Sequence, residues 1–334
     1  MGGYSVYNPI RSNMMRKIGC SFSKKERKHL GFHRMVFSGF FEKHPDFVNT
    51  IDGRILAEEL VWQDAGCPMY FPESPELVDM LWRSKMNVRI EDLELDKMPR
   101  AFSIAWPNHL VDGVQPMGCM IWWGDGTHWK DAFFRMEREY CRGLFDGVRG
   151  MASPDLRLGL HMSFCKEDVE AQRYGVKHSY YRASVPNDLF VSGLASCGDF
   201  EQTFKRYNSP NLTGVLSLTP EEIHIQYVTF KLAIRMLVYM RACPQYIRKG
   251  YPGGKNHKAF ESRWDEFDPN VIGMPARMWT GTHESPMTHL RTWHFRSYPI
   301  RQNGTRRNGV VFVNATVVNA AIDPVTIEDG GSIN

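Results

Sequence analysis

The sequence predicts an α+β fold, with a helical N-terminal part, a mixed core around a long buried helix and a C-terminal β-hairpin. Three observations carry this prediction. Helix-start signals and amphipathic spacing dominate up to about residue 98, and short apolar runs separated by Gly/Pro turns follow. A long apolar segment at 223–242 then precedes two strand-like runs near the end of the chain.

Length and composition indicate a folded chain with more than one part. The 334 residues exceed one average domain, and 43% hydrophobic with 13% aromatic residues exclude wholesale disorder. We expect a flexible basic N-terminus, a mainly helical part, a mixed α/β core, a C-terminal β-hairpin and a loose tail. Their predicted ranges are, in that order, 1–20, 21–98, 99–270, 271–322 and 323–334.

Three helices are predicted in the N-terminal part. Ser23 begins a capping box with Glu26, and the apolar positions that follow favour a helix ending before Pro45. Residues 54–63 and 74–86 form two further helical patterns, the second with Ser74 as its cap and Pro75 at its first position.

The core is predicted to alternate strands and helices. Residues 101–107 and 118–124 are typical of short buried strands, and 156–164 alternates as a strand does. Residues 128–147 and 199–207 favour helices.

The strongest prediction is a central buried helix. Thr219 caps it, Pro220 stands at its first position, and two glutamates lie in the first turn, where the helix dipole favours negative charge. Its body is apolar on most sides and ends before Pro244. After a loop-rich stretch, 244–287, the runs 289–300 and 309–319 predict a hairpin with a longer connecting loop.

Charge and cysteine usage are typical of a cytoplasmic protein. Residues 11–34 carry eight Lys or Arg and one Glu, and residues 285–321 carry five arginines and no acid. Each of these basic segments could bind phosphate or an acidic partner; the alternative is that each forms a solvated basic face. The seven cysteines are scattered without a CxxC pair, as in a reducing compartment. The N-terminus lacks the apolar core of a signal peptide, and Lys231 and Arg235 interrupt the most apolar helix, which argues against a membrane span.

The stretch "THLRTWHFRSYP" (288–299) is the leading candidate site. Two histidines and arginines suit RNA cleavage, with His289 or His294 as acid or base, but side chains alternate along a strand, so these two point to opposite faces. His289 then shares a face with Arg291 and Phe295, and His294 shares one with Arg296 and Tyr298. This arrangement favours recognition over catalysis; a polar structural role is the alternative.

Other candidates favour structural roles. Asp125, His128 and Asp131 have the spacing of metal ligands but lack further ligands, and the same residues suit a turn and a helix cap. Basic residues surround a tryptophan set that either stacks on bases or, as we favour, lies in the core. That set is Trp106, Trp122, Trp123 and Trp129. The chain has no Walker, GxGxxG, HExxH or GxSxG motif, and we expect no cofactor and no metal.

The segment "SPMTHLRTWHFRSYPIRQNGTRRNGVVFVNATVVNA" (285–320) resembles the C-terminal signature of a phage and mobile-element family. The family includes the type V-A anti-CRISPR proteins that lower the messenger RNA of the Cas nuclease. In it, a Pro-His-x-Arg-Arg-x-His-Trp-like run precedes a basic loop and a strand ending in Val-Asn. The matching positions are His289, Arg291, His294, Tyr298 and Asn319, with Phe295 in place of the aromatic Trp; Thr292 replaces the second arginine, and Arg296 follows the aromatic position.

The resemblance implies a phage-encoded protein of the host cytoplasm that recognises a nascent defence polypeptide, or its translating mRNA at the ribosome, and promotes loss of the transcript. Binding would then involve the hairpin residues already named together with Arg306 and Arg307 of its basic loop. Two alternatives stay open. One is a ribonuclease or RNA-binding protein that acts directly on RNA, and the other is a structural phage protein.

Overall fold

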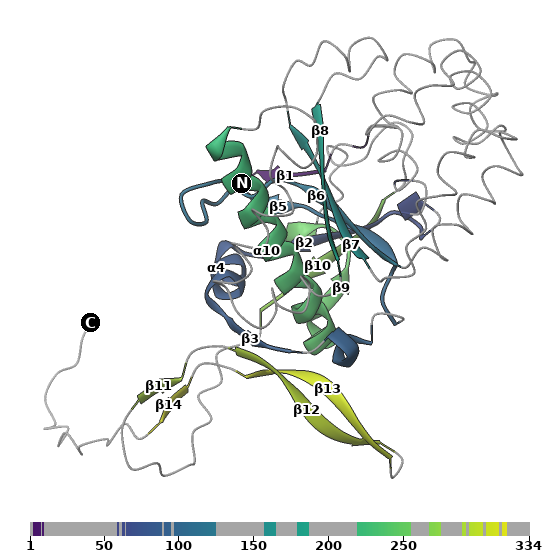
Figure 1. The fold of residues 1–334 in the computed structure, drawn as a ribbon, viewed down its shortest axis with the longest axis vertical. Helices are drawn as coiled ribbons and strands as arrows, with labels where there is room; N and C mark the ends of the chain where they lie inside the picture. Colours follow the sequence, from purple (N-terminus) through teal and green to yellow (C-terminus); the bar gives the residue numbers. More distant parts are fainter. Residues whose placement is uncertain are drawn as a thin grey trace, which may run out of the picture.

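The computed structural model contains both helices and sheets, which confirms the predicted α+β class. Figure 1 shows the arrangement of these elements. The structure describes the following residues: 3–7, 9, 59, 62–63, 65–88, 90–94, 97–124, 157–164, 179–186, 219–254, 267–274, 289–291, 294–302, 305–313 and 316–318.

A seven-stranded mixed sheet forms the centre of the described structure. Its strand order is β8-β7-β6-β4-β2-β10-β9, in which β2, β4 and β10 run parallel and the other neighbours are antiparallel. In chain order these strands are β2 (Pro68–Pro72), β4 (Ala101–Ile104), β6 (Cys119–Gly124), β7 (Arg157–Phe164), β8 (Ser179–Pro186), β9 (Ile247–Lys249) and β10 (Asp268–Ile272).

Both faces of the middle strands are buried. In β2, Tyr70 belongs to one apolar cluster, and its neighbours Met69 and Phe71 belong to a cluster on the other face. In β6, Ile121 and Trp122 divide in the same way. Parallel strands covered on both faces have continuous apolar sequences without alternation. This explains why "PMYFP", bounded by two prolines, gave no strand signal in the sequence.

Helix α10 (Pro220–Ala242) crosses one face of this sheet beside α4 (Pro75–Arg83), as Figure 1 shows. The predicted start is confirmed: Thr219 and Glu222 form a capping box, with Pro220 at the first position. Every residue from 226 to 240 is buried. A helix that is apolar on all sides needs such surroundings, so the sequence prediction of a central buried helix is confirmed.

Two buried cations of α10, Lys231 and Arg235, contact α4. Arg235 Nη1 donates to the carbonyl oxygens of Leu81, at 2.6 Å, and Trp82, near the end of α4 where backbone acceptors lack helical partners. Lys231 Nζ lies 3.7 Å from the centroid of the Trp82 ring and donates to the Tyr227 hydroxyl at 3.3 Å. Polar residues that interrupt an apolar segment thus connect two helices inside the protein.

A second sheet of three strands lies beyond the C-terminal end of α10. It contains β3 (Lys85–Asn87), β12 (His294–Gln302) and β13 (Thr305–Val313), in the order β13-β12-β3. Strand β12 pairs antiparallel with β13 along its whole length and parallel with β3 over residues 294–296. Two small pairings complete the described strands: β11 (His289–Arg291) with β14 (Thr316–Val318), and β1 (Tyr4–Ser5) with β5 (Trp106–Pro107).

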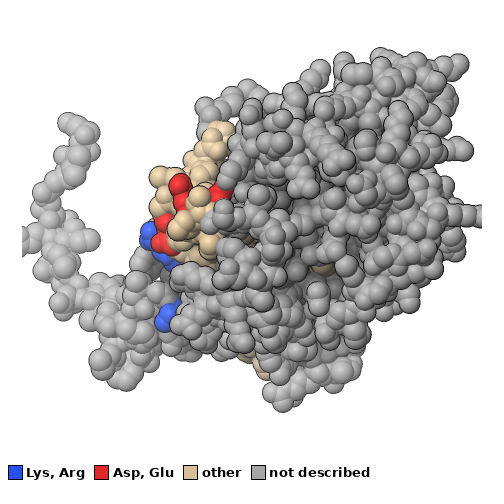
Figure 2. All heavy atoms as spheres, turned by 45° about the horizontal axis from the view of Figure 1, so that its top comes forward, with Lys and Arg blue, Asp and Glu red and all other residues tan. Residues whose placement is uncertain are grey.

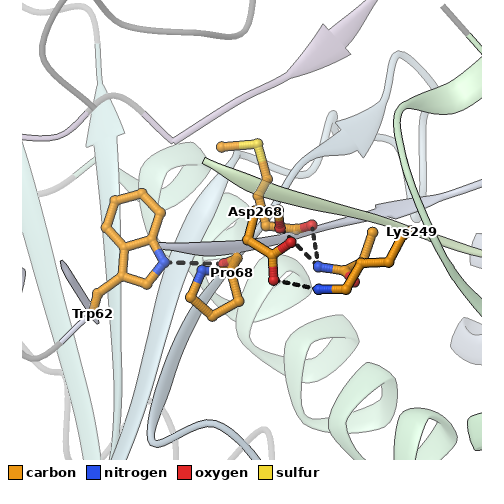
Figure 3. Close-up of polar contacts among 6 residues, drawn as sticks. Trp62, Pro68, Lys249 and Asp268 are labelled. Atoms are coloured by element: carbon orange, nitrogen blue, oxygen red, sulfur yellow. Dashed lines mark hydrogen bonds and ion pairs between the residues drawn. The ribbon is translucent and has the colours of Figure 1, made fainter. Parts of the chain in front are cut away.

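Side-chain contacts near β2, β9 and β10 stabilise this part of the large sheet (Figure 3). The Trp62 indole donates to the Pro68 carbonyl at 3.0 Å, the Asn270 amide donates to the Asp268 carbonyl at 2.7 Å, and Lys249 pairs with the Asp268 carboxylate. Three short 3-10 turns are also described: η4 (Ile90–Leu93), η7 (Pro244–Tyr246) and η8 (Pro252–Gly254).

The structure differs from the sequence predictions at several boundaries. Strands β2 and β3 lie in the part 21–98 that was predicted to be mainly helical, and β2 is bonded to β4 and β10, so that part shares a sheet with the predicted core. Helix α4 ends at Arg83 instead of residue 86, because Ser84 adopts an extended conformation and β3 begins. The predicted loop 244–287 contains β9 and β10.

The predicted hairpin is confirmed, but the bounds of its two strands differ from those predicted. Its strands are 294–302 and 305–313, and the pair Gln302↔Thr305 leaves only Asn303 and Gly304 between them. The longer loop that we predicted is therefore wrong, and the Asn-Gly dipeptide is the pair favoured in two-residue hairpin connections. The helices predicted from Ser23, at 128–147 and at 199–207, and most of the one at 54–63, lie outside the described residues.

The junction between α10 and the C-terminal sheet is expected to be essential for stability. Phe295 is fully buried, with its ring centroid 6.2 Å from Tyr239 and 5.0 Å from Phe312. Phe295→Ala leaves a cavity and should lower the free energy of unfolding by about 3–5 kcal/mol in urea denaturation. Leu110→Ala, at a side chain 64% exposed, is the control and should change it by less than about 0.5 kcal/mol. Equal effects would contradict this packing.

Candidate binding surface

Three of the predicted site residues lie together on β12. Arg296 and Tyr298 are exposed, the latter by 47%, and His294 is half-buried. Their two-residue spacing places them on one face of the strand, as the sequence predicted. We call this side of the three-stranded sheet the outer face, and define it by these residues and their cross-strand neighbours.

Phe295, also predicted to bind, lies on the opposite face. Its side chain has no solvent exposure, and it packs with Tyr239 and Phe312 at the end of α10. Met86 and Val310 are buried on the same side. Phe295 is therefore a core residue that fixes the strand, and the prediction that it belongs to the binding surface is corrected.

Two neighbouring strands complete the outer face. In the parallel pair, His294 lies beside Lys85, which is exposed. In the antiparallel pair, His294, Arg296 and Tyr298 lie opposite Val313, Val311 and Gly309. The residue opposite Tyr298, Gly309, has no side chain to pair with the ring. The outer face thus combines cations, one exposed aromatic ring and small apolar residues.

Arg296 and Tyr298 contact each other. The guanidinium carbon lies 5.3 Å from the centroid of the Tyr298 ring, within cation–π distance. Because the guanidinium is planar and always charged, it keeps its hydrogen-bond donors available for a carboxylate or phosphate while it rests on the ring. The hairpin 294–313 contains four arginines and no acidic residue.

Acidic groups gather elsewhere in the described structure. Exposed or partly exposed carboxylates lie on α4 and on the turn beside the start of α10, among them Glu76, Asp79 and Asp112. Figure 2 shows acidic atoms grouped in the described patch of one face, with basic atoms beside and below them. On the outer face itself, the exposed charged residues described are the cations Lys85 and Arg296.

The structure does not bring the two candidate catalytic histidines into one strand. His289 and Arg291 belong to β11, which pairs with β14, and His294 begins β12 in the three-stranded sheet. Residues 292 and 293, between the strands, lie outside the described residues, as does Asn319. Arg306 and Arg307 occupy β13 positions paired with Arg301 and Ile300, near the hairpin turn. The remaining five predicted binding residues stay a prediction: His289, Arg291, Arg306, Arg307 and Asn319.

A second polar group lies where the parallel strands end. In many open α/β sheets, ligands bind at the carboxyl ends of parallel strands. Here Glu73, directly after β2, pairs with Arg248 of β9, and the Tyr4 hydroxyl donates to the Pro72 carbonyl at 3.0 Å. Burial, and secondly Glu73, raise the pKa of Tyr4. Nearby, His109 Nε2 lies 2.9 Å from Asp79 Oδ1. Each of these groups has its own partner within the protein, so they are explained as separate structural contacts and not as a binding site.

Two of the described cysteines, Cys119 and Cys243, have thiols that burial keeps protonated. Burial raises the pKa of the Cys119 thiol to about 12, and burial also raises that of Cys243 to about 12. A thiol in this state is protonated at neutral pH and is a poor nucleophile. Both therefore act as small buried hydrophobes, as the sequence indicated.

The described members of the predicted tryptophan set are core residues. Trp106, Trp122 and Trp123 are all buried, which confirms the structural interpretation over base stacking; Trp129 lies outside the described residues. The Asp125, His128 and Asp131 group also lies outside them.

Within the ranges that the structure does describe, no three His, Cys, Asp or Glu side chains are placed to hold a metal ion. In the same part of the chain, no helix is long and apolar enough to cross a membrane.

Lys85 is the member of the outer face that the sequence did not identify. It is more than 200 residues away from β12 along the chain, and "KMN" resembles the end of a helix. Only the parallel pairing of β3 with β12 places it beside His294.

Comparisons with known proteins give no further identification. No protein-family model matches the chain, and no curated protein matches it. The resemblance of residues 285–320 therefore depends only on the matching positions within that segment.

Alkaline stability tests the packing of the seven-stranded sheet around Tyr70. Burial, and secondly Asp268, raise the pKa of Tyr70 from 10 to about 12. The folded state favours the neutral phenol, so this contribution to stability is complete below pH 10 and is lost as pH rises through 12. Tyr70→Phe should therefore lose less stability than the parent chain between pH 10 and 12 in urea unfolding. An equal loss would show that Tyr70 ionises normally in the folded protein.

Proposed function

We propose that the chain is a non-enzymatic recognition protein of phage origin that acts against host defence in the cytoplasm. It recognises a nascent defence polypeptide, its translating mRNA, or both, and promotes loss of that transcript. The type V-A nuclease is the target class that the resemblance of residues 285–320 implies. The proposal needs no cofactor and no metal.

One observation supports the proposal most. Arg296 and Tyr298 are exposed side by side on a strand whose other face is fixed in the core through Phe295. A rigid strand holds its exposed side chains in place, so little conformational entropy is lost on binding. Exposed Arg and Tyr are also the residue types enriched where proteins bind partners.

A ribonuclease that acts directly on RNA is the alternative. The outer face supplies His294 as an acid or base and Arg296 as a cation for the charged transition state. Recognition is favoured because the described structure places no second histidine on this face. Incubation of the purified protein with the transcript, in the absence of ribosomes, separates the two. Cleavage that His294→Ala abolishes would establish the ribonuclease and contradict the recognition proposal.

Co-expression with a type V-A nuclease gene tests the proposal in cells. We expect the nuclease transcript to fall severalfold, and a pull-down from translating cells to recover both its mRNA and its N-terminal peptide. The double variant Arg296→Ala/Tyr298→Ala should abolish both effects, and Leu110→Ala, an exposed site elsewhere, should preserve them. An unchanged transcript level would contradict this target, and co-purification with phage particles would instead support a structural role.

A further inference from the structure

The outer face has the composition of a surface that binds single-stranded nucleic acid. We propose that it binds single-stranded RNA directly, with the Tyr298 ring stacked on a base and with Arg296 and Lys85 contacting phosphates. This inference rests on the proposed function and specifies its ligand. It assigns the contact to the RNA strand and not to the polypeptide.

The charge of the surface fits a polyanion. Arg296 and Lys85 are both exposed, and neither has a carboxylate partner among the described residues. The strand pair that carries Arg296 contains no acid over residues 294–313, and its other arginines lie toward the turn. Cations without acidic neighbours attract phosphates and release their counterions on binding.

The aromatic group fits a base in the same place. Tyr298 is an exposed aromatic ring, 47% accessible, and the residue directly opposite it in register is Gly309, which has no side chain. An exposed ring beside cations on a sheet face is the arrangement by which several RNA-binding modules stack unpaired bases. A base in a duplex is already stacked on its neighbours, so this contact selects single strands.

The pairing of β12 argues against an extended peptide at this position. Peptides that extend a sheet need an unpaired strand edge, where backbone groups supply the affinity. Strand β12 bonds to β13 along its length and to β3 at residues 294–296, so at Arg296 both backbone edges are paired and only side chains are accessible, whereas over 297–302 the described pairing is with β13 alone. Stacking and phosphate contacts use side chains alone, and therefore RNA is the favoured ligand.

The spacing agrees with contact to one strand. Residues on one face of a β-strand recur about every 6.6 Å, so the centres of Arg296 and Tyr298 are separated by roughly one such step. Lys85 adds a second cation on the neighbouring strand beside His294. A single strand that follows β12 would thus meet cations first and then the ring.

Fluorescence anisotropy with a labelled 15-nucleotide oligouridine tests the inference on the full chain. A duplex of the same length and an oligo-glutamate peptide serve as comparison ligands. We expect the single strand to bind most tightly. Tyr298→Ala should weaken it about 5- to 150-fold, and Tyr298→Phe should retain binding because the ring remains. Arg296→Ala should weaken it about tenfold and lower the slope of log K against log salt by about 0.7.

A charge-matched variant distinguishes a specific contact from net charge. Lys249→Ala removes one exposed cation from β9, an edge strand of the seven-stranded sheet that is not bonded to the outer face, and should leave affinity and salt slope nearly unchanged. Equal losses in Lys249→Ala and Arg296→Ala, or no binding of oligouridine, would overturn the inference. Binding of the peptide alone would overturn it and leave the proposed function intact. RNA binding without transcript loss in cells would support it and contradict the proposed function.

Discussion

The packing of three aromatic rings at the end of α10 connects the seven-stranded sheet with the three-stranded sheet. Tyr239 lies in the helix that covers the seven-stranded sheet, and its ring contacts both Phe295 and Phe312 of the hairpin. Its hydroxyl donates to the Gly273 carbonyl, directly after β10, at 2.9 Å. The Tyr239 side chain thus connects α10 with both the large sheet and the C-terminal sheet. Burial raises the pKa of its hydroxyl.

This contact determines which face of the hairpin meets solvent. Side chains alternate along a strand, so burial of Phe295 forces His294, Arg296 and Tyr298 outward. A shift of one residue in register would bury Arg296 and expose Phe295, at a large cost in free energy. The burial of Phe295 in the core therefore determines that His294, Arg296 and Tyr298 face solvent.

The sequence predicted those features that depend on local patterns. The capping box of Thr219, the apolar body of α10 and the start of α4 at Ser74 and Pro75 are local signals, and all were correct. Strand β2 was missed because buried parallel strands do not alternate, and β10 was missed because its sequence begins with Asp268, Pro269 and Asn270, which are typical of turns. Lys85 was missed because its place beside His294 arises from a pairing between distant segments. Phe295 was misplaced because the choice of buried face depends on Tyr239, which no local pattern indicates.

Photo-crosslinking from position 298 tests the central claim, that the outer face contacts the RNA strand. A photoreactive phenylalanine analogue replaces Tyr298 in one protein, and Leu110, exposed on the connection between β5 and β6, in a second. After irradiation of translating cells, we predict an RNA adduct from position 298 that ribonuclease digests, and none from position 110. No adduct from position 298, or equal adducts from both positions, would contradict the account.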